Sequence, residues 1–353
     1  MNSKIKKNGL DFIGSCVDNL FLGIPAILKP LKPKRSINRA TYERQINYYI
    51  DNGFIDNPET FFTLPEEMPR YTIITQKPYC DGMYQVISYP SNYETKNPLI
   101  RDQFDSYTAN KTGYLVRWAH GDKGRKTVLC LHGFMLGNPR QAERMFKVRK
   151  LFRMGLDVAL FITPFHWKRS PGSRTSRHIF LQPDDVVMTC ECFGQTMYDL
   201  YGSFLILNDI GVGEIGIIGA SLGGYNAALF ISLTQAASFA VMVVPAVKFS
   251  HPYDPDSFRL PFHIDETLRE KINLVWELHS PLHLFPKIPK ERIMFVASRG
   301  DRLCPFEHVR MLCEKWGWPQ HYFLTGGHWL VFNNIRGKAW YNFLIEMGFI
   351  QTG

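Results

Sequence analysis

From residue 127 onward, short apolar segments alternate with longer helical ones, and this alternation constrains the fold more than any other feature. The predicted strands are nearly continuous apolar runs, at 127–131, 158–162, 215–218, 240–244, 293–297 and 321–324. Helices are predicted at 140–153, 184–209, 223–234, 306–315 and 337–347. Such alternation is typical of a parallel sheet covered by helices on both faces. We therefore expect an α/β fold whose functional residues follow the carboxyl ends of its strands.

The upstream half has a different pattern. Three short strands, bounded by Pro, Gly, Asn and Asp, are predicted at 72–75, 83–88 and 114–118, and we expect them to start the sheet in antiparallel fashion. Residues 1–70 are predicted to form an N-terminal helical extension with an amphipathic helix at 40–50. The α/β domain then occupies 71–353. Its segment at about 245–290 is longer than a plain connection and predicts a small lid-like insertion.

Bulk composition narrows the class of protein. With 45% hydrophobic and 21% charged residues, the chain is typical of a globular protein. The net charge of +9 suits an anionic partner, but no nucleic-acid-binding module is present, so we expect no nucleic-acid partner. Seven cysteines form an odd set, and the one close pair, Cys190 and Cys192, has neither zinc-finger nor thioredoxin spacing. We therefore predict no metal site and a reducing, cytoplasmic location.

The N-terminal segment permits two interpretations. Residues 10–28 are mostly apolar and are followed by a basic run at 29–35, but Asp11 and Asp18 interrupt the apolar stretch. These charges, and the lack of an A-x-A cleavage site, argue against a signal peptide and a transmembrane span. Either this segment forms a helix docked on the protein body, or residues 10–35 make peripheral contact with an anionic membrane surface.

A G-x-S-x-G motif at 219–223 follows the predicted strand 215–218 and precedes a helix. In this context the small flanking residues permit a strained turn that lifts the hydroxyl of Ser221 above the sheet. A glycine-rich turn that merely allows tight packing is the alternative. A serine hydroxyl is a weak nucleophile unless a base takes its proton, and that base needs an orienting partner. Ser221 as a nucleophile therefore requires an acid and a histidine elsewhere in the chain.

Both residues follow later strands. Asp301 lies in the turn after the strand at 293–297, and His328 follows two glycines after the last strand. We predict that Ser221, Asp301 and His328 form a catalytic triad in that chain order. Glu307 and Asp254 remain alternatives for the acid.

Backbone amides must also stabilise the negative charge that develops on a substrate oxygen. One amide normally follows the nucleophile and a second lies in an early strand-to-helix loop. These positions predict Leu222 and Phe134 as the two donors of an oxyanion hole. The alternative is that His132 and Gly133, which precede Phe134, are ordinary turn residues.

Together the segments 132–134, 219–223, 300–305 and 326–328 resemble those of the α/β-hydrolase superfamily, which includes serine esterases and lipases. The resemblance covers roughly residues 113–350. It implies a mostly parallel sheet of about eight strands with helices on both faces, no cofactor, and catalysis through a covalent acyl-enzyme intermediate. One segment departs from the family: where many relatives have an acidic D-x-P-G-H-G-like turn, residues 163–174 are basic and aromatic.

This basic segment bears on the substrate. Lys168, Arg169, Arg174 and Arg177 can pair with a phosphate or carboxylate, although a solvated loop explains them equally well. The expected function is a serine hydrolase, carboxylesterase-like or lipase-like, that cleaves a small-molecule or lipid ester. A peptidase or thioesterase of the same fold is one alternative. A non-catalytic, membrane-associated binding protein is another.

Overall fold

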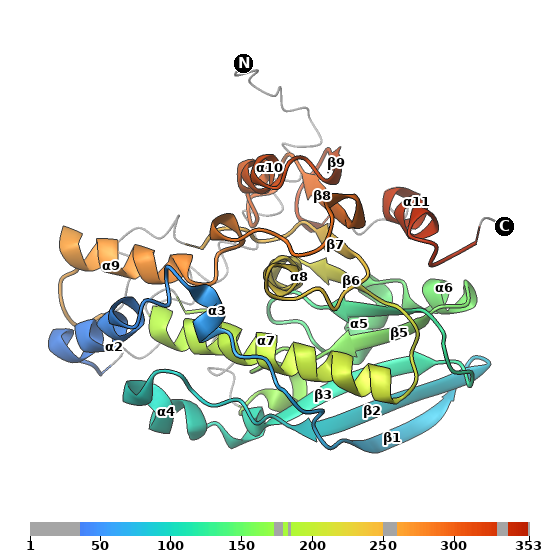
Figure 1. The fold of residues 1–353 in the computed structure, drawn as a ribbon, viewed down its shortest axis with the longest axis horizontal. Helices are drawn as coiled ribbons and strands as arrows, with labels where there is room; N and C mark the ends of the chain where they lie inside the picture. Colours follow the sequence, from blue (N-terminus) through green and yellow to red (C-terminus); the bar gives the residue numbers. More distant parts are fainter. Residues whose placement is uncertain (1–35, 173–178, 183–184, 250–259, 330–337, 352–353) are drawn as a thin grey trace.

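The computed structural model describes residues 36–172, 179–182, 185–249, 260–329 and 338–351, and one sheet of nine strands runs through it (Figure 1). The strands are β1 (Thr72–Tyr79), β2 (Gly82–Pro90), β3 (Thr112–Ala119), β4 (Thr127–Leu131), β5 (Asp157–Phe161), β6 (Ile215–Ala220), β7 (Ala240–Val243), β8 (Ile293–Ser298) and β9 (Gln320–Leu324). The α-helices are α2 (Arg39–Asp51), α3 (Pro58–Phe61), α4 (Arg101–Asp105), α5 (Pro139–Met145), α6 (Val148–Arg153), α7 (Val186–Asp209), α8 (Leu222–Leu233), α9 (Glu266–Glu277), α10 (Phe306–Lys315) and α11 (Lys338–Glu346).

The sheet is antiparallel at one edge and parallel elsewhere. Its strand order is β1-β2-β3-β5-β4-β6-β7-β8-β9, and every neighbouring pair from β5 to β9 is parallel. The first three strands add to β5 in antiparallel fashion. This confirms the predicted mostly parallel sheet, with nine strands rather than about eight. The carboxyl ends of β4, β6, β8 and β9 therefore meet at the same edge of the sheet.

Alternate residues of each central strand face two separate apolar cores. In β4, Leu129 and Leu131 pack into one core, whereas Val128 and Cys130 pack into the other. The first core is covered by α2, α7, α8, α9 and α10, and the second by α5, α6 and α11 (Figure 1). Because side chains alternate across a strand, a run such as 127–131 must be apolar throughout to fill both cores. This explains why the central strands are continuous apolar runs.

A buried carboxylate on α7 joins three parts of the first core. Glu191 accepts hydrogen bonds from the hydroxyls of Tyr49 on α2 and Tyr93, both at 2.7 Å. It also accepts the backbone N–H groups of Lys96 at 2.9 Å and Asn97 at 3.1 Å. Burial raises the pKa of Glu191 despite these donors. The four bonds satisfy a group that would otherwise be costly to bury.

The amphipathic helix predicted at 40–50 is α2, whose buried face carries Tyr42, Ile46 and Tyr49. Asn38 caps it by accepting the backbone N–H of Thr41 at 2.8 Å. The proposed membrane-contacting segment, residues 10–35, lies outside the described residues. Within the described part of the chain, no helix combines the length and apolar character needed to cross a bilayer.

Two helical segments differ from expectation. The helix predicted at 140–153 is broken into α5 and α6, because Lys147 adopts a left-handed conformation with φ 53°. The lid-like segment contains an unpredicted helix, α9, which Asp265 caps by accepting the backbone N–H of Leu268 at 3.0 Å. Residues 250–259 of the same segment are outside the described residues, and its role as a lid stays a prediction.

Candidate active site

Ser221 occupies a strained turn between β6 and α8. Its φ of 55° and ψ of −115° lie in a region that non-glycine residues rarely adopt. The turn is held by its backbone: the N–H donates to Val243 at 2.9 Å, and the carbonyl accepts from Tyr225 and Ala246, both at 3.1 Å. Strain of this kind costs of order 1–3 kcal/mol and persists only where the surroundings enforce it. The bonds to Val243, at the end of β7, and to Ala246, just after it, provide that enforcement.

The glycines of the motif are required by close contacts. A Cβ on Gly219 would lie 2.1 Å from the carbonyl oxygen of Gly223, and one on Gly223 would lie 1.9 Å from that of Leu131. No side chain fits at such distances. The tight approach brings the start of α8 against the end of β4, beside the loop that carries the second predicted oxyanion donor.

The predicted acid and base are in contact. Nδ1 of His328 lies 2.7 Å from Oδ2 of Asp301, and both residues are at least 95% buried. The other carboxylate oxygen, Oδ1, accepts the backbone N–H groups of Leu303 at 2.9 Å and Cys304 at 2.7 Å. Asp301 is therefore fixed by its own turn while it holds the imidazole. The alternative acid Glu307 is exposed on α10, and Asp254 lies outside the described residues.

The two turns that carry Asp301 and His328 are joined to each other. Beyond the ends of β8 and β9, the N–H of Arg299 donates to the carbonyl of Leu324 at 2.9 Å, and that of Gly300 donates to Gly326 at 2.8 Å. The hydroxyl of Ser298 donates to the same Gly326 carbonyl at 2.6 Å. These bonds extend the strand pairing into the turns, so the acid and the histidine are held as one unit.

A cysteine that the motif analysis missed completes this cluster. The Sγ of Cys304 lies 3.8 Å from the Oγ of Ser221 and also interacts with the ring of His328. Cys304 thus lies beside both Ser221 and the Asp301–His328 pair, and the direct contact of Ser221 with His328 stays a prediction. The sequence held one signal for this contact, since Cys304 follows Asp301 by three positions in the same turn.

Burial and charge act in opposite directions on these groups. Burial lowers the pKa of His328, but Cys304 and Asp301 favour the charged ring and raise the pKa well above its usual value. Burial also raises the pKa of the Cys304 thiol. Asp301 would thus stabilise the imidazolium that forms when the neutral ring takes a proton from a neighbouring hydroxyl.

The loop after β4 lies against Ser221. A Cβ on Gly133 would be 3.4 Å from the Cβ of Ser221, which places Phe134, the next residue, beside the nucleophile. The following amide, of Met135, donates to Nε2 of His166 at 3.1 Å and so anchors the loop. On the other side, Leu222 is the first residue of α8, where helix amides lack acceptors within the helix. Leu222 thus follows Ser221 directly and Gly133, the residue before Phe134, lies against it, while the role of both amides as oxyanion donors stays a prediction.

Two buried histidines hold this loop to the segment after β5. Nε2 of His132 accepts the backbone N–H of Thr163 at 3.2 Å, much as His166 accepts that of Met135. Burial lowers the pKa of His132 to about 3 and that of His166 to about 4. Both rings are therefore neutral at pH 7, which leaves them the lone pairs that these contacts need.

Arg169 does not occupy a substrate-binding position. It lies in a 3-10 turn, Trp167–Arg169, and its side chain is fully buried. The guanidinium pairs with Asp199 of α7 at 2.5 Å and donates to the carbonyls of Ile162 at 3.1 Å and Asn110 at 3.0 Å. Its role is to neutralise a buried carboxylate. The prediction that Arg169 contacts the substrate is corrected accordingly. It rested on the basic residues near Arg169 in the sequence, and these give no sign that the side chain of Arg169 is buried.

The other predicted basic residues are placed differently. Lys168 is exposed, and its Nζ lies 5.6 Å from the ring centroid of Tyr114 and 5.3 Å from that of Trp167. This is the geometry of a cation–π contact. Arg174 and Arg177 lie outside the described residues. Substrate contact by Lys168 and Arg174 stays a prediction.

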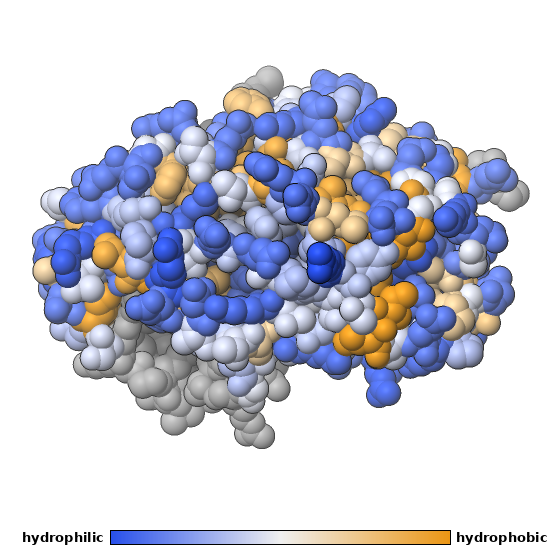
Figure 2. All heavy atoms as spheres, turned by 60° about the horizontal axis from the view of Figure 1, so that its bottom comes forward, coloured by the Kyte–Doolittle hydropathy of each residue, from blue (hydrophilic) through white to orange (hydrophobic). Residues whose placement is uncertain are grey.

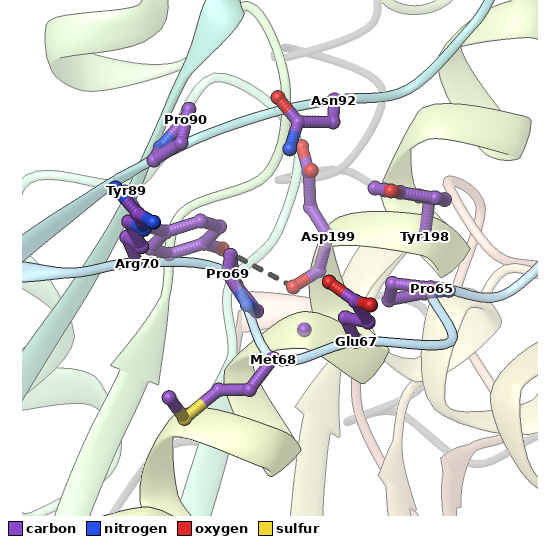
Figure 3. Close-up of a pocket in the computed structure, with 11 residues that line it drawn as sticks. Pro65, Glu67, Met68, Pro69, Arg70, Tyr89, Pro90, Asn92, Tyr198 and Asp199 are labelled. Carbon is purple, nitrogen blue, oxygen red and sulfur yellow. Dashed lines mark hydrogen bonds between the residues drawn. The ribbon is translucent and has the colours of Figure 1, made fainter.

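A separate cavity of about 380 Å³ lies between residues 65–70, the end of β2 and α7 (Figure 3). Tyr89 donates across it to the backbone carbonyl of Asp199 at 3.1 Å. None of the predicted triad residues lines it. The Ser221 cluster, rather than this cavity, is therefore the candidate active site.

Figure 2 shows the face at the bottom of Figure 1, where the coloured residues are mostly hydrophilic and the apolar residues lie in separate groups.

Comparison with known proteins gives the following matches. No family model matches the sequence. An uncharacterized protein of Mycobacterium tuberculosis strain CDC 1551 / Oshkosh is 26% identical over 349 residues, which covers 90% of this chain and 82% of that protein. An uncharacterized protein of strain ATCC 25618 / H37Rv matches with the same identity and coverage.

Two solved structures resemble the fold. Acetyl xylan esterase 1 from Thermoanaerobacterium sp. JW/SL YS485 superposes with a TM-score of 0.59 at 14% identity, covering 85% of this chain and 93% of that one. An acetyl xylan esterase from Paenibacillus sp. R4 gives a TM-score of 0.55 at 14% identity, covering 91% and 98%. At this identity the likeness concerns the fold.

Proposed function

Because the chain has the α/β-hydrolase fold, we propose that it is a serine hydrolase that cleaves a carboxylic ester bond. The observation that supports the proposal is the strained turn of Ser221 together with the Asp301–His328 contact, with Cys304 beside Ser221. A strained serine and a carboxylate-held histidine at the same edge of the sheet are the groups that nucleophilic acyl transfer requires. A solely structural turn would not need the buried acid and base.

The proposed reaction begins with attack of Ser221 Oγ on the substrate carbonyl carbon. His328 takes the hydroxyl proton, and Asp301 stabilises the resulting imidazolium through its 2.7 Å contact with Nδ1. The amides of Leu222 and Phe134 donate to the oxyanion of the tetrahedral intermediate. His328 then returns the proton to the leaving alcohol, which yields an acyl-serine. Water, deprotonated by His328, attacks the acyl carbon and releases the acid and free Ser221.

Esters are the preferred substrate class for two reasons. The two solved structures compared above are acetyl xylan esterases, which act on ester bonds by name. In addition, an alcohol is a better leaving group than an amine, so an ester places less demand on the general acid. We propose a small-molecule or lipid ester, with peptidase and thioesterase activities as the alternatives.

A fluorophosphonate probe tests the nucleophile. Wild-type protein is expected to label, and Ser221→Ala to lose the label. A matched control is Ser232→Ala, since Ser232 lies in the same helix α8, where its buried hydroxyl only donates to the carbonyl of Ala228. Folded wild-type protein that fails to label, or equal labelling of Ser221→Ala, would reject the proposal.

A substrate panel then separates the hydrolase classes. We expect kcat/KM to be highest for p-nitrophenyl esters or phospholipids, compared with acyl-CoA thioesters and peptides. Preference for a thioester or a peptide would reassign the enzyme within the fold. Comparing vesicle co-sedimentation of the full chain with that of a form lacking residues 1–35 tests the proposed membrane contact. Undiminished sedimentation of the shortened form would reject it.

A further inference from the structure

We propose that Cys304 and His328, with Ser221 alongside, also form a binding site for a thiophilic divalent cation such as Zn²⁺, and that its occupancy switches the hydrolase off. The inhibitory part rests on the proposed function, whereas cation binding by these residues does not. The proposal starts from the contact between Cys304 Sγ and Ser221 Oγ, at 3.8 Å. The triad does not need a thiol at that place.

The chemistry of the cluster suits zinc. Asp301, Cys304 and His328 each offer a ligand atom, these atoms lie within 4.8 Å of one another, and no other such trio occurs in the described part of the chain. Zinc binds thiolate sulfur and imidazole nitrogen at about 2.0–2.3 Å in tetrahedral geometry, which separates its ligand atoms by about 3.5 Å. Side-chain shifts of about 1 Å thus bring the thiol of Cys304 and a ring nitrogen of His328 to zinc-binding separation, and the hydroxyl of Ser221 already lies 3.8 Å from that thiol.

The backbone already holds the two ligand-bearing turns in place. The N–H of Cys304 donates to Oδ1 of Asp301 at 2.7 Å, so the position of the thiol is coupled to that of the carboxylate. His328 comes from the neighbouring turn, which the Gly300–Gly326 bond joins to the acid turn. A site on two joined turns loses little conformational freedom when it binds an ion.

Asp301 supplies the outer partner that a zinc-bound histidine needs. A metal-ligating imidazole normally binds through one nitrogen while a carboxylate or carbonyl holds the other. Here Asp301 holds Nδ1 of His328, which directs metal binding to Nε2. Cys304 Sγ is the second ligand, the Ser221 hydroxyl is the third, and water completes the tetrahedron. Binding converts the thiol to a metal-bound thiolate and uses the lone pair of Nε2, so the proton of the thiol and any proton on Nε2 are released to solvent.

Zinc and catalysis then compete for the same atoms. The lone pair on Nε2 of His328 that would bind zinc is the one that must accept the proton of Ser221. A coordinated Ser221 hydroxyl is likewise unable to reach a substrate carbonyl. Bound zinc therefore blocks both hydrolysis and fluorophosphonate labelling, and a chelator restores both.

Zinc binding is measured directly on the reduced, full-length protein by competition with a chromophoric chelator. We expect one zinc per chain for wild type and none for Cys304→Ala. Cys80→Ala is the matched control. Cys80 is an exposed free thiol that directly follows β1, so the Cys80→Ala protein should bind zinc like wild type. Cys304→Ser, checked by circular dichroism, serves if the alanine variant does not fold. A thiolate-to-cobalt absorption band with Co²⁺ in place of zinc, absent from Cys304→Ala, identifies the sulfur ligand.

The activity arm compares rates with and without zinc for each protein. Wild type and Cys80→Ala should slow by about tenfold or more and recover with EDTA, whereas Cys304→Ala should change by less than about twofold. Wild type that binds no zinc, or Cys304→Ala that binds it equally, overturns the site. Zinc binding by a protein that never labels with fluorophosphonate leaves the site intact but rejects the hydrolase. Labelling without zinc binding rejects the zinc site and leaves the hydrolase proposal intact.

Discussion

The carboxylate of Asp301 faces His328 with one oxygen and its own backbone with the other. Oδ2 meets Nδ1 of the imidazole at 2.7 Å, while Oδ1 accepts the amides of Leu303 and Cys304. The side chain is therefore oriented before any substrate arrives. The two oxygens therefore have different partners. An amide side chain could still accept the backbone N–H groups but could not accept a hydrogen bond from Nδ1 with its NH₂ group, which makes the role of Asp301 testable.

Asp301→Asn is expected to fold but to lose catalysis. The amide oxygen of asparagine can keep accepting the two backbone N–H groups, whereas its NH₂ group would face Nδ1 of His328 and favour the wrong tautomer. We expect kcat for ester hydrolysis to fall by about three to four orders of magnitude. Glu307→Gln, which alters the exposed alternative acid, should leave kcat unchanged. Equal kinetics for the two variants would remove Asp301 from the triad.

Gly223→Ala should destabilise the fold, because the added methyl group would lie 1.9 Å from the carbonyl oxygen of Leu131. We expect the free energy of unfolding to drop by about 3 kcal/mol, measured by chemical denaturation. The matched control is Gly121→Ala, since a Cβ at Gly121 meets no atom within 4 Å. A Gly223 variant as stable as the Gly121 variant would contradict the tight approach of α8 to β4.

Arg169 and Asp199 should behave as a coupled pair. Arg169→Met leaves a buried carboxylate without its cation and should cost about 3–5 kcal/mol of stability, and the double variant with Asp199→Leu should recover part of this loss. KM for an anionic ester should stay within about twofold of wild type, measured against a neutral ester. A KM that rises only for the anionic ester would return Arg169 to the substrate site.

Stability should fall in mild acid because three buried histidines resist protonation. The pKa values of His132, His166 and His279 are lowered to about 3, 4 and 3, mainly by burial. The contribution of these histidines to the free energy of unfolding is complete above the histidine pKa in the unfolded chain, about 6.5. It is lost as pH falls, because only the unfolded chain then gains protons. The loss reaches about 2 kcal/mol per histidine by pH 5. Glu191 and Asp199, whose pKa values burial raises, act in the opposite direction.

A comparison of wild type with a His279 variant isolates the contribution of one buried histidine to the pH dependence of stability. His279→Gln should lower the slope of unfolding free energy against pH by up to about 1.4 kcal/mol per unit between pH 6.5 and pH 4. Urea denaturation at several pH values measures both slopes. Identical slopes for wild type and variant would show that His279 is not held neutral in the folded state.

Elements with a local pattern were predicted closely. The apolar run 127–131 is β4 residue for residue, and 306–315 is α10. The positions of Asp301 and His328 followed from a general property of parallel sheets, whose carboxyl ends lie together. Each of these predictions needed only neighbouring residues and the order of strands.

Features that depend on burial or on distant pairing were missed. Nothing in the spacing of Arg169 and Asp199, thirty positions apart, indicated that they would meet inside the protein. The contact of Cys304 with Ser221 spans 83 positions and depends on how far the acid turn extends over β6. Helix α9 was a different omission, because Asp265 before a helix-forming run is a recognisable capping signal.

The hydrogen bonds at Glu191 limit how far the chain can be trimmed. A fragment that begins at residue 71 would lose the hydroxyl of Tyr49, one of four donors to that carboxylate. It would also expose the apolar side of α7 that α2 covers. Exposed apolar surfaces of this kind promote aggregation. Shortened versions made for crystallisation or inhibitor screening should therefore keep the chain from Asn38 onward.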